Sequence, residues 1–163
     1  MTDHLLIDGW NVCWKIPEIA RDIPDRSREA RQKFNMLIKN YLADKKIAYR
    51  IFYDGQPDIV PGESVKNPNI HFSKNPEKAD QLIISFLRKQ LREQRKPQQW
   101  TVITSDRELA HKAKALEARI ISSDDFIARL RKHKTSSNDA VAKDDVFLSR
   151  QEIEYWLQKF KDQ

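Results

Sequence analysis

The sequence predicts an α/β fold in which a central, mainly parallel sheet has helices on both faces. Short apolar runs typical of buried strands alternate with longer segments whose apolar residues recur at helical spacing. This alternation is typical of parallel strands joined by helices. Three of the strand-like runs lead into an aspartate, namely Asp8, Asp54 and Asp106. Because ligands of open α/β sheets bind outside the carboxyl ends of the strands, these aspartates are candidate site residues.

The N-terminal part of the chain predicts a strand followed by a long helix. Residues 5–8 form an apolar run that Gly9 ends, and Pro17 limits any helix in the apolar segment after it. Residues 25–44 carry apolar side chains at the spacing of one helix face, namely Ala30, Phe34, Leu37, Ile38, Tyr41 and Leu42.

The middle of the chain predicts a second strand, a loop, a short strand and a second long helix. Residues 48–53 are rich in aromatic and β-branched side chains, as strands are. Residues 55–68 hold two glycines and three prolines and therefore predict a loop, after which residues 69–72 suggest a short strand. Residues 78–96 predict a helix that Pro97 stops, with one apolar face made by Ala79, Leu82, Ile83, Phe86, Leu87 and Leu91.

The remaining part of the predicted domain alternates again. A strand is expected at residues 100–104, a helix at 106–116 and a strand at 119–121. Ser122 and Asp125 have the spacing of a capping box, which predicts the start of a last helix that runs through Arg131.

Beyond this point the composition changes. Residues 132–148 are polar and read as a linker between a domain of residues 1–131 and a C-terminal segment of residues 149–163. Ser149 and Glu152 form another capping box before an amphipathic helix, whose apolar side chains are Ile153, Trp156, Leu157 and Phe160. A helix this short is marginal alone, so it is expected to dock on its own domain or on a partner.

Composition narrows the classes of function. The 163 residues fit one domain, and the net charge of +6 with a pI near 9.4 favours a polyanionic partner such as nucleic acid. No apolar run approaches the roughly 20 residues that span a bilayer, and no secretory signal is read, so a cytoplasmic protein without a membrane partner is expected. Cys13 is the sole cysteine and cannot form an intrachain disulfide. Three glycines leave no glycine-rich phosphate loop.

The aspartates indicate a metal. Asp80, at the start of the helix predicted from residue 78, joins the three aspartates that follow strands. Carboxylates gathered at one sheet edge repel one another unless a cation is present, and an oxygen-only set without thiolates suits Mg²⁺ or Mn²⁺. Each aspartate also has an ordinary explanation as a turn or capping residue. Glu77, three residues before Asp80, is a further candidate for the same site.

Four short motifs resemble those of NYN domains. The run from Leu6 to Val12, LIDGWNV, is similar to the family's opening DGYN motif, with Trp10 in place of tyrosine. The FYDG that ends at Gly55 resembles its second strand, and the EKAD that ends at Asp80 resembles its ETAD helix start. The VITSD that ends at Asp106 resembles its VTSD element. The resemblance covers about residues 4 to 131 and points to the bacterial YacP-like branch.

The resemblance implies a three-layer, Rossmann-like PIN/NYN fold and an Mg²⁺- or Mn²⁺-dependent endoribonuclease acting in mRNA decay or RNA processing. By position, Asp8, Asp80 and Asp106 are the implied metal ligands, and the implied supporting residues of the catalytic site are Asn11, Asp54 and Ser105. Two positions depart from the family: Lys78 stands where threonine is common, and Glu117 stands where glycine is common.

The expected substrate is single-stranded or loop RNA, with the ribosome as a further candidate partner. Five basic side chains are candidate contacts to the RNA phosphates, namely Lys74, Lys78, Arg88, Arg92 and Arg107. Trp10 or Trp14 is a candidate platform for an unpaired base, although a tryptophan is more often part of the core. The alternative is an RNA- or ribosome-binding module of the same fold without catalysis.

Overall fold

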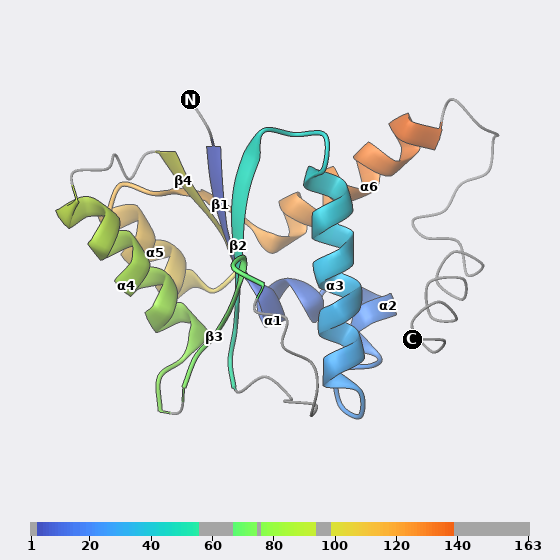
Figure 1. The fold of residues 1–163 in the computed structure, drawn as a ribbon, viewed down its shortest axis with the longest axis horizontal. Helices are drawn as coiled ribbons and strands as arrows, with labels where there is room; N and C mark the ends of the chain where they lie inside the picture. The colour runs from blue at the N-terminus through green and yellow to red at the C-terminus, as the bar shows by residue number, and fades with distance from the viewer. Residues whose placement is uncertain (1–2, 56–66, 75, 94–98, 139–163) are drawn as a thin grey trace. The chain divides into compact units, whose positions relative to one another are not determined.

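A five-stranded, all-parallel sheet forms the centre of the molecule (Figure 1). The computed structural model describes residues 3–55, 67–74, 76–93 and 99–138. The strand order is β3-β2-β1-β4-β5 and each pair of neighbours is parallel. The strands are β1 (Asp3–Asp8), β2 (Ile47–Tyr53), β3 (Ile70–Phe72), β4 (Trp100–Ile103) and β5 (Arg119–Ile121). The predicted α/β fold with a parallel sheet is therefore confirmed.

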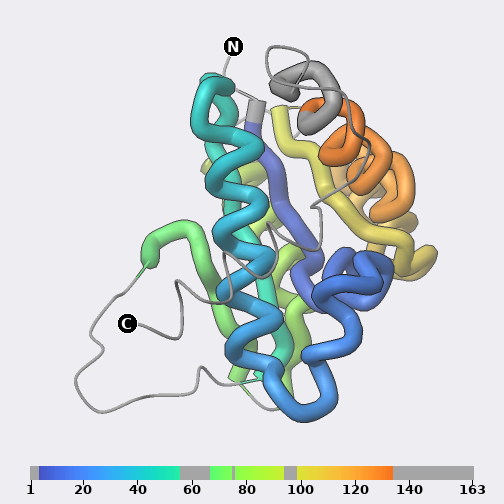
Figure 2. The backbone as a smooth tube through the Cα atoms, turned by 90° about the vertical axis from the view of Figure 1, so that its right-hand side faces the viewer, coloured from blue at the N-terminus to red at the C-terminus, as the bar shows by residue number. Residues whose placement is uncertain are grey.

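Helices cover both faces of this sheet (Figure 1). One face carries α4 (Ala79–Arg92) and α5 (Arg107–Ala115), which contact each other and the strands beneath them. The other face carries α1 (Gly9–Cys13), α2 (Pro17–Ala20) and α3 (Ser27–Leu42). In the perpendicular view of Figure 2, α3 runs along the strands of β1 and β2. The three layers are those expected of a sheet whose buried strands need cover on both sides.

The apolar periodicity of the long helices decides which sides are buried. Along α3, the side chains that the 25–44 pattern placed toward the core are buried or half-buried, and Phe34 and Ile38 are completely enclosed. Along α4, Ile83 and Leu87 are completely enclosed against the sheet, whereas Leu91 is 45% exposed. The expectation that Leu91 belongs to the buried face of α4 is therefore wrong, because it lies in the last turn of the helix, where α4 ends at Arg92.

Several helix boundaries differ from the expected ones. A short helix, α2, begins at Pro17, which suits the first helical position because that position needs no backbone N–H. The helix α4 begins at Ala79 and ends at Arg92, inside the expected range of 78–96. The helix α6 (Ser123–Asn138) continues past Arg131. Its start is as predicted, since the Ser122 hydroxyl accepts the N–H of Asp125 at 3.1 Å.

Glu117 explains why glycine is common at its position. It has a φ of 64°, in the left-handed region that follows a helix C-terminus and favours glycine. The N–H of Ala118 reaches back to the carbonyl of Ala113 at 3.1 Å, which closes the end of α5. The departure from the family at Glu117 therefore lies in the turn after α5.

The chain divides into two compact units, residues 1–127 and 128–163, and the second is described only as far as residue 138. The expected C-terminal helix at 149–163, and most of the expected linker at 132–148, lie outside the described residues. The division into 1–131, 132–148 and 149–163 therefore stays a prediction. In the part of the chain that the structure describes, none of the helices has the length and apolar character needed to span a membrane.

Candidate functional site

The site lies at the carboxyl edge of the sheet, where the strand order reverses. The chain builds β2 and β3 on one side of β1, then crosses to add β4 and β5 on the other. Such a reversal opens a crevice between two neighbouring strands, here β1 and β4. Asp8 ends β1, and Thr104 follows β4 directly. The Thr104 hydroxyl donates to Asp8 Oδ2 at 3.0 Å, so the two strand ends are joined at the crevice.

Asn11 connects three segments at this edge. Its Oδ1 accepts the backbone N–H of Ser105 at 2.8 Å and the hydroxyl of Ser123 at 2.7 Å. The Ser105 hydroxyl in turn accepts the N–H of Ser123 at 3.1 Å. Ser123 is completely buried, so these bonds are shielded from competing water. Asn11 and Ser105 thus lie at this edge of the sheet and hold the loop after β4 in place.

Asp106 is fixed by the start of α5. Its Oδ1 accepts the N–H groups of Glu108 and Leu109 at 2.9 and 3.2 Å, as an N-cap residue does. Its own N–H donates to the Thr104 hydroxyl at 3.1 Å. Thr104 therefore links Asp8 to Asp106 through one hydroxyl, although the sequence analysis did not select it. The sequence feature that could have identified it is a hydroxyl residue directly after a buried strand and two positions before Asp106.

Asp54 and Asp80 belong to the start of α4. Asp54 Oδ1 accepts the N–H of Ala79 at 2.6 Å, so the end of β2 caps a helix 25 residues further along the chain. Asp80 Oδ1 accepts the N–H of Gln81 at 2.9 Å. The indole N–H of Trp10 donates to the carbonyl of Asp54 at 3.3 Å, which joins this pair to the opening motif.

All four aspartates are held in the same manner. In each of Asp8, Asp54, Asp80 and Asp106, one carboxylate oxygen accepts a hydrogen bond from the scaffold. Within the described part of the chain, the other oxygen of each accepts none. The scaffold therefore orients four carboxylates and leaves each with one oxygen available to a ligand.

The charges of these residues act on one another. Burial raises the pKa of Asp8 to about 7, against an ordinary value of 3.8, while the hydrogen bond from Thr104 lowers it. The charges of Asp54, Asp106 and Asp80 raise the same pKa further. The four side chains thus form one electrostatic cluster, and a cation placed among them would relieve the repulsion that Asp8 experiences.

The cluster fits a hard cation in its chemistry. Carboxylate, amide and hydroxyl oxygens are the donors that Mg²⁺ and Mn²⁺ prefer. In their present positions, however, the described residues offer no group of three or more histidine, cysteine or acidic side chains able to hold a metal. A bound cation would therefore have to draw the free oxygens together.

Of the other predicted site residues, Lys74, Lys78, Arg107 and Trp10 lie near this edge, whereas Arg88 and Arg92 lie further along α4. Lys74 and Lys78 are exposed in the segment that leads into α4, Arg107 is exposed at the start of α5, and Arg88 and Arg92 are exposed along α4. Trp10 is half-buried, with its ring edge against Tyr53 at a centroid distance of 5.1 Å. Trp14 is 55% exposed and so is the more accessible of the two tryptophans.

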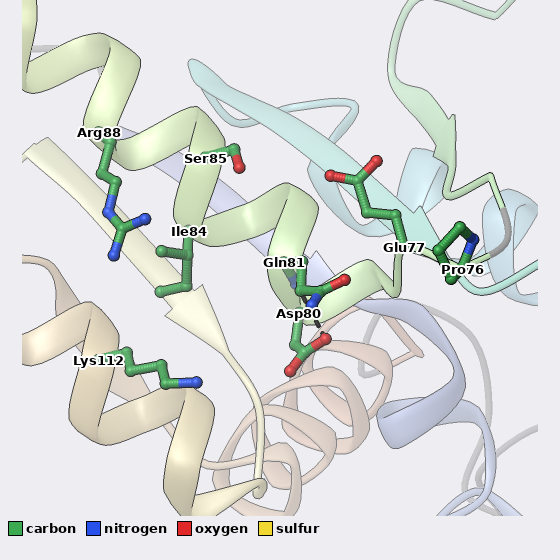
Figure 3. Close-up of a pocket in the computed structure, with 8 residues that line it drawn as sticks. All are labelled: Pro76, Glu77, Asp80, Gln81, Ile84, Ser85, Arg88 and Lys112. Atoms are coloured by element: carbon green, nitrogen blue, oxygen red, sulfur yellow. Dashed lines mark hydrogen bonds between the residues drawn. The ribbon is translucent and has the colours of Figure 1, made fainter.

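Glu77 and Asp80 line the same cavity, although they do not share a helical face as the spacing suggested. The helix starts at Ala79, so Glu77 precedes it and the two residues do not share a helical face. Figure 3 shows their carboxylates pointing in different directions, with that of Asp80 toward the gap between α4 and α5.

Asp8 gives the metal-free protein a pH-dependent stability. Between about pH 4 and pH 7 the folded protein keeps a proton that the unfolded chain has released, because the folded pKa is raised from 3.8 to about 7. The free energy of unfolding therefore falls as the pH rises through this window and levels off above it. The full shift corresponds to about 4 kcal/mol, and partial exposure reduces it to roughly 2 to 4 kcal/mol.

Asp8→Asn is expected to remove this dependence because asparagine does not titrate in this range. Its side-chain oxygen can still accept the Thr104 hydrogen bond. In urea unfolding with EDTA, the variant should match the wild type near pH 4 and exceed its stability by roughly 2 to 4 kcal/mol at pH 8. Parallel stability curves for the two proteins across this range would contradict the assignment.

Comparisons with known proteins agree with the fold. The family model of the YacP-like NYN domain matches residues 5–162. The crystal structure of Rae1 (YacP) from Bacillus subtilis is 18% identical in sequence, with a TM-score of 0.63 over 99% of this chain and 95% of that chain. The structure of its W164L mutant is also 18% identical, with a TM-score of 0.64 over 83% of this chain and 85% of that chain. No curated protein matches this sequence significantly.

Proposed function

The chain belongs to the family of YacP-like NYN domains, and we propose that it is a metal-dependent endoribonuclease. One observation carries this proposal. Four aspartates from three strand ends and a helix start form one electrostatic cluster at the switch point of the sheet, and each has a carboxylate oxygen that accepts no hydrogen bond from the described residues. The chain carries a net charge of +6 despite these aspartates, so it can attract a polyanion and still place acidic groups at one point.

The proposed roles follow from the positions of the side chains. Asp8, Asp80 and Asp106 are the residues that would hold Mg²⁺ or Mn²⁺. Such a cation lowers the pKa of a bound water and stabilises the charge on the phosphate oxygens during hydrolysis. Asn11 and Ser105 keep the loop after β4 beside Asp8, and Asp54 fixes the start of α4 so that Asp80 faces the cluster. The phosphate to be cut lies against this edge of the sheet.

An RNA- or ribosome-binding module of the same fold is the second candidate. It is favoured by the lack, among the described side chains, of a preformed group of three metal ligands. Against it stands the cluster itself, because four carboxylates beside a polyanion weaken binding unless a cation offsets them.

Incubation with a pool of circular, single-stranded RNA distinguishes the nuclease from the binding module. The circular form has no ends, so its conversion to linear products reports internal cleavage only. We expect linear products in Mn²⁺ or Mg²⁺ and none in EDTA, measured on denaturing gels. RNA that is retained by the protein but stays circular over a range of both metals would contradict the nuclease and support the binding module.

A further inference from the structure

A groove extends from the acidic cluster along the outer side of α4. It is a cavity of about 640 Å³, a size within the roughly 300–1,000 Å³ of ligand pockets. Its walls come from α4, from the segment just before it and from α5 (Figure 3). The lining residues are Pro76, Glu77, Asp80, Gln81, Ile84, Ser85, Arg88 and Lys112.

The charges in this groove are ordered along its length. Asp80 lies at the end that belongs to the acidic cluster, and Arg88 lies eight residues further along α4. Eight residues correspond to about 12 Å along a helix axis. Lys112 enters from α5, and Figure 3 shows its side chain and that of Arg88 extending into the space between the two helices. The groove therefore has two acidic side chains, Glu77 and Asp80, near the start of α4, and its two cations are Arg88 and Lys112.

Both cations can accept a new anionic partner. Arg88 is exposed and, among the residues that the structure describes, takes part in no ion pair. Lys112 is paired with Glu108 at 2.6 Å, but their side chains are 51% and 74% exposed. An exposed pair of this kind contributes little to stability, so a phosphate can replace Glu108 at low cost.

The groove is also electrostatically connected to the cluster. The hydrogen bond and charge of Glu108 raise the pKa of Lys112, and the charges of Asp80 and Asp106 raise it to a smaller degree. Lys112 therefore lies within electrostatic range of two of the proposed metal ligands.

We propose that this groove binds the single-stranded RNA segment next to the scissile phosphate, with Arg88 and Lys112 each contacting a backbone phosphate. The inference rests on the proposed function and adds the path of the substrate. Gln81 and Ser85 supply polar groups between the two charged ends, within reach of a sugar or base. A single strand fits such a groove because its phosphates and bases can be splayed apart, whereas a duplex presents a rigid shape.

Salt-dependent binding tests the path without requiring cleavage. An unstructured, fluorescent 12-nucleotide RNA is titrated in EDTA, at several salt concentrations, with wild type, Arg88→Gln, Lys112→Gln and the double variant. Each phosphate contact contributes about 0.7 to the slope of log K against log salt for a single strand. The double variant is therefore expected to lose about 1.4 of this slope and on the order of tenfold in affinity at low salt.

Two variants serve as matched controls. Lys89→Gln and Lys114→Gln each remove one exposed positive charge from the same two helices, but neither side chain lines the groove. Each control variant and each single groove variant changes the net charge by the same amount. A difference in salt slope between the two sets therefore reports contacts in the groove alone.

The outcomes separate this inference from the nuclease itself. A loss of slope in the groove variants beyond that of the controls supports the path, even if the wild type cuts no RNA. Equal slopes in groove and control variants overturn the path, even if the wild type cuts circular RNA in Mn²⁺. Absence of measurable RNA binding by the wild type also overturns it.

Discussion

Replacing Asp8 or Asp106 with asparagine is expected to lower RNA cleavage by more than about 100-fold while RNA binding is kept or improved. Loss of a residue that merely supports a metal ligand typically costs 10- to 100-fold in affinity or activity, so loss of a ligand should cost more. Binding should not suffer, because each substitution removes a negative charge from the edge that the RNA approaches.

Asparagine is the informative substitution because it preserves the scaffold. Its side-chain oxygen can accept the Thr104 hydroxyl at position 8, and asparagine caps helices as well as aspartate at position 106. Circular dichroism and thermal unfolding should therefore show folded variants. The expected readout is the single-turnover rate of linearisation of circular RNA in Mn²⁺.

Asp124→Asn is the matched control. Asp124 pairs with Lys15 at 2.9 Å and its side chain is 70% exposed, so the control loses the same charge without touching the cluster. Its cleavage rate should stay within about twofold of the wild type, as for a typical surface substitution. Rates for Asp8→Asn and Asp106→Asn that match the control would contradict their assignment as metal ligands.

Local sequence patterns predicted the sheet and the four aspartates because both depend on neighbouring residues. The apolar runs that end at Asp8 and Asp54 are buried on both sides, and parallel strands place their carboxyl ends at the same edge. The position of β1 between β2 and β4 then decides which strand ends meet. This strand order depends on the packing of the whole sheet, so no single segment of the sequence predicts it.

The supporting contacts could not be predicted in the same way. The bond from Ser123 to Asn11 joins residues 112 positions apart, and that from Thr104 to Asp8 joins residues 96 positions apart. Serine and threonine after a strand are equally compatible with a cap or a turn, so their type alone does not identify a partner. Lys112 was missed for a similar reason, since its relation to the groove depends on how α5 packs on α4.

The substitution Gly9→Ala is expected to destabilise the protein by about 3 kcal/mol, the upper part of the usual range for overpacking. A Cβ at Gly9 would lie 2.5 Å from Cε1 and 2.6 Å from Cδ1 of Tyr53, and 2.9 Å from the carbonyl oxygen of Phe52. The ring cannot move aside freely, because Tyr53 is completely buried and its hydroxyl donates to Asn35 at 2.6 Å. Thermal unfolding should shift down by roughly 6–12 °C.

Gly55→Ala separates crowding from backbone conformation. Gly55 has a φ of 94°, but a Cβ there would meet nothing within 4 Å, so its cost is the strain of the left-handed region, about 1–2 kcal/mol. Combining each substitution with Tyr53→Leu, which removes the crowding ring edge, gives two double-mutant cycles. The Gly9 cycle should deviate from additivity by at least about 1 kcal/mol, and the Gly55 cycle should not.

The same contact links Gly9 to the geometry of the site, because any side chain at this position would crowd Tyr53 and Phe52. Gly9 lets the first turn of α1 approach β2 closely, and this approach sets the positions of Asp8 on one side and Trp10 on the other. Gly9→Ala protein that remains folded at low temperature is therefore expected to cut circular RNA more slowly than Gly55→Ala protein. Additive Gly9 and Tyr53 effects, together with wild-type cleavage by Gly9→Ala, would show that the close approach is not required.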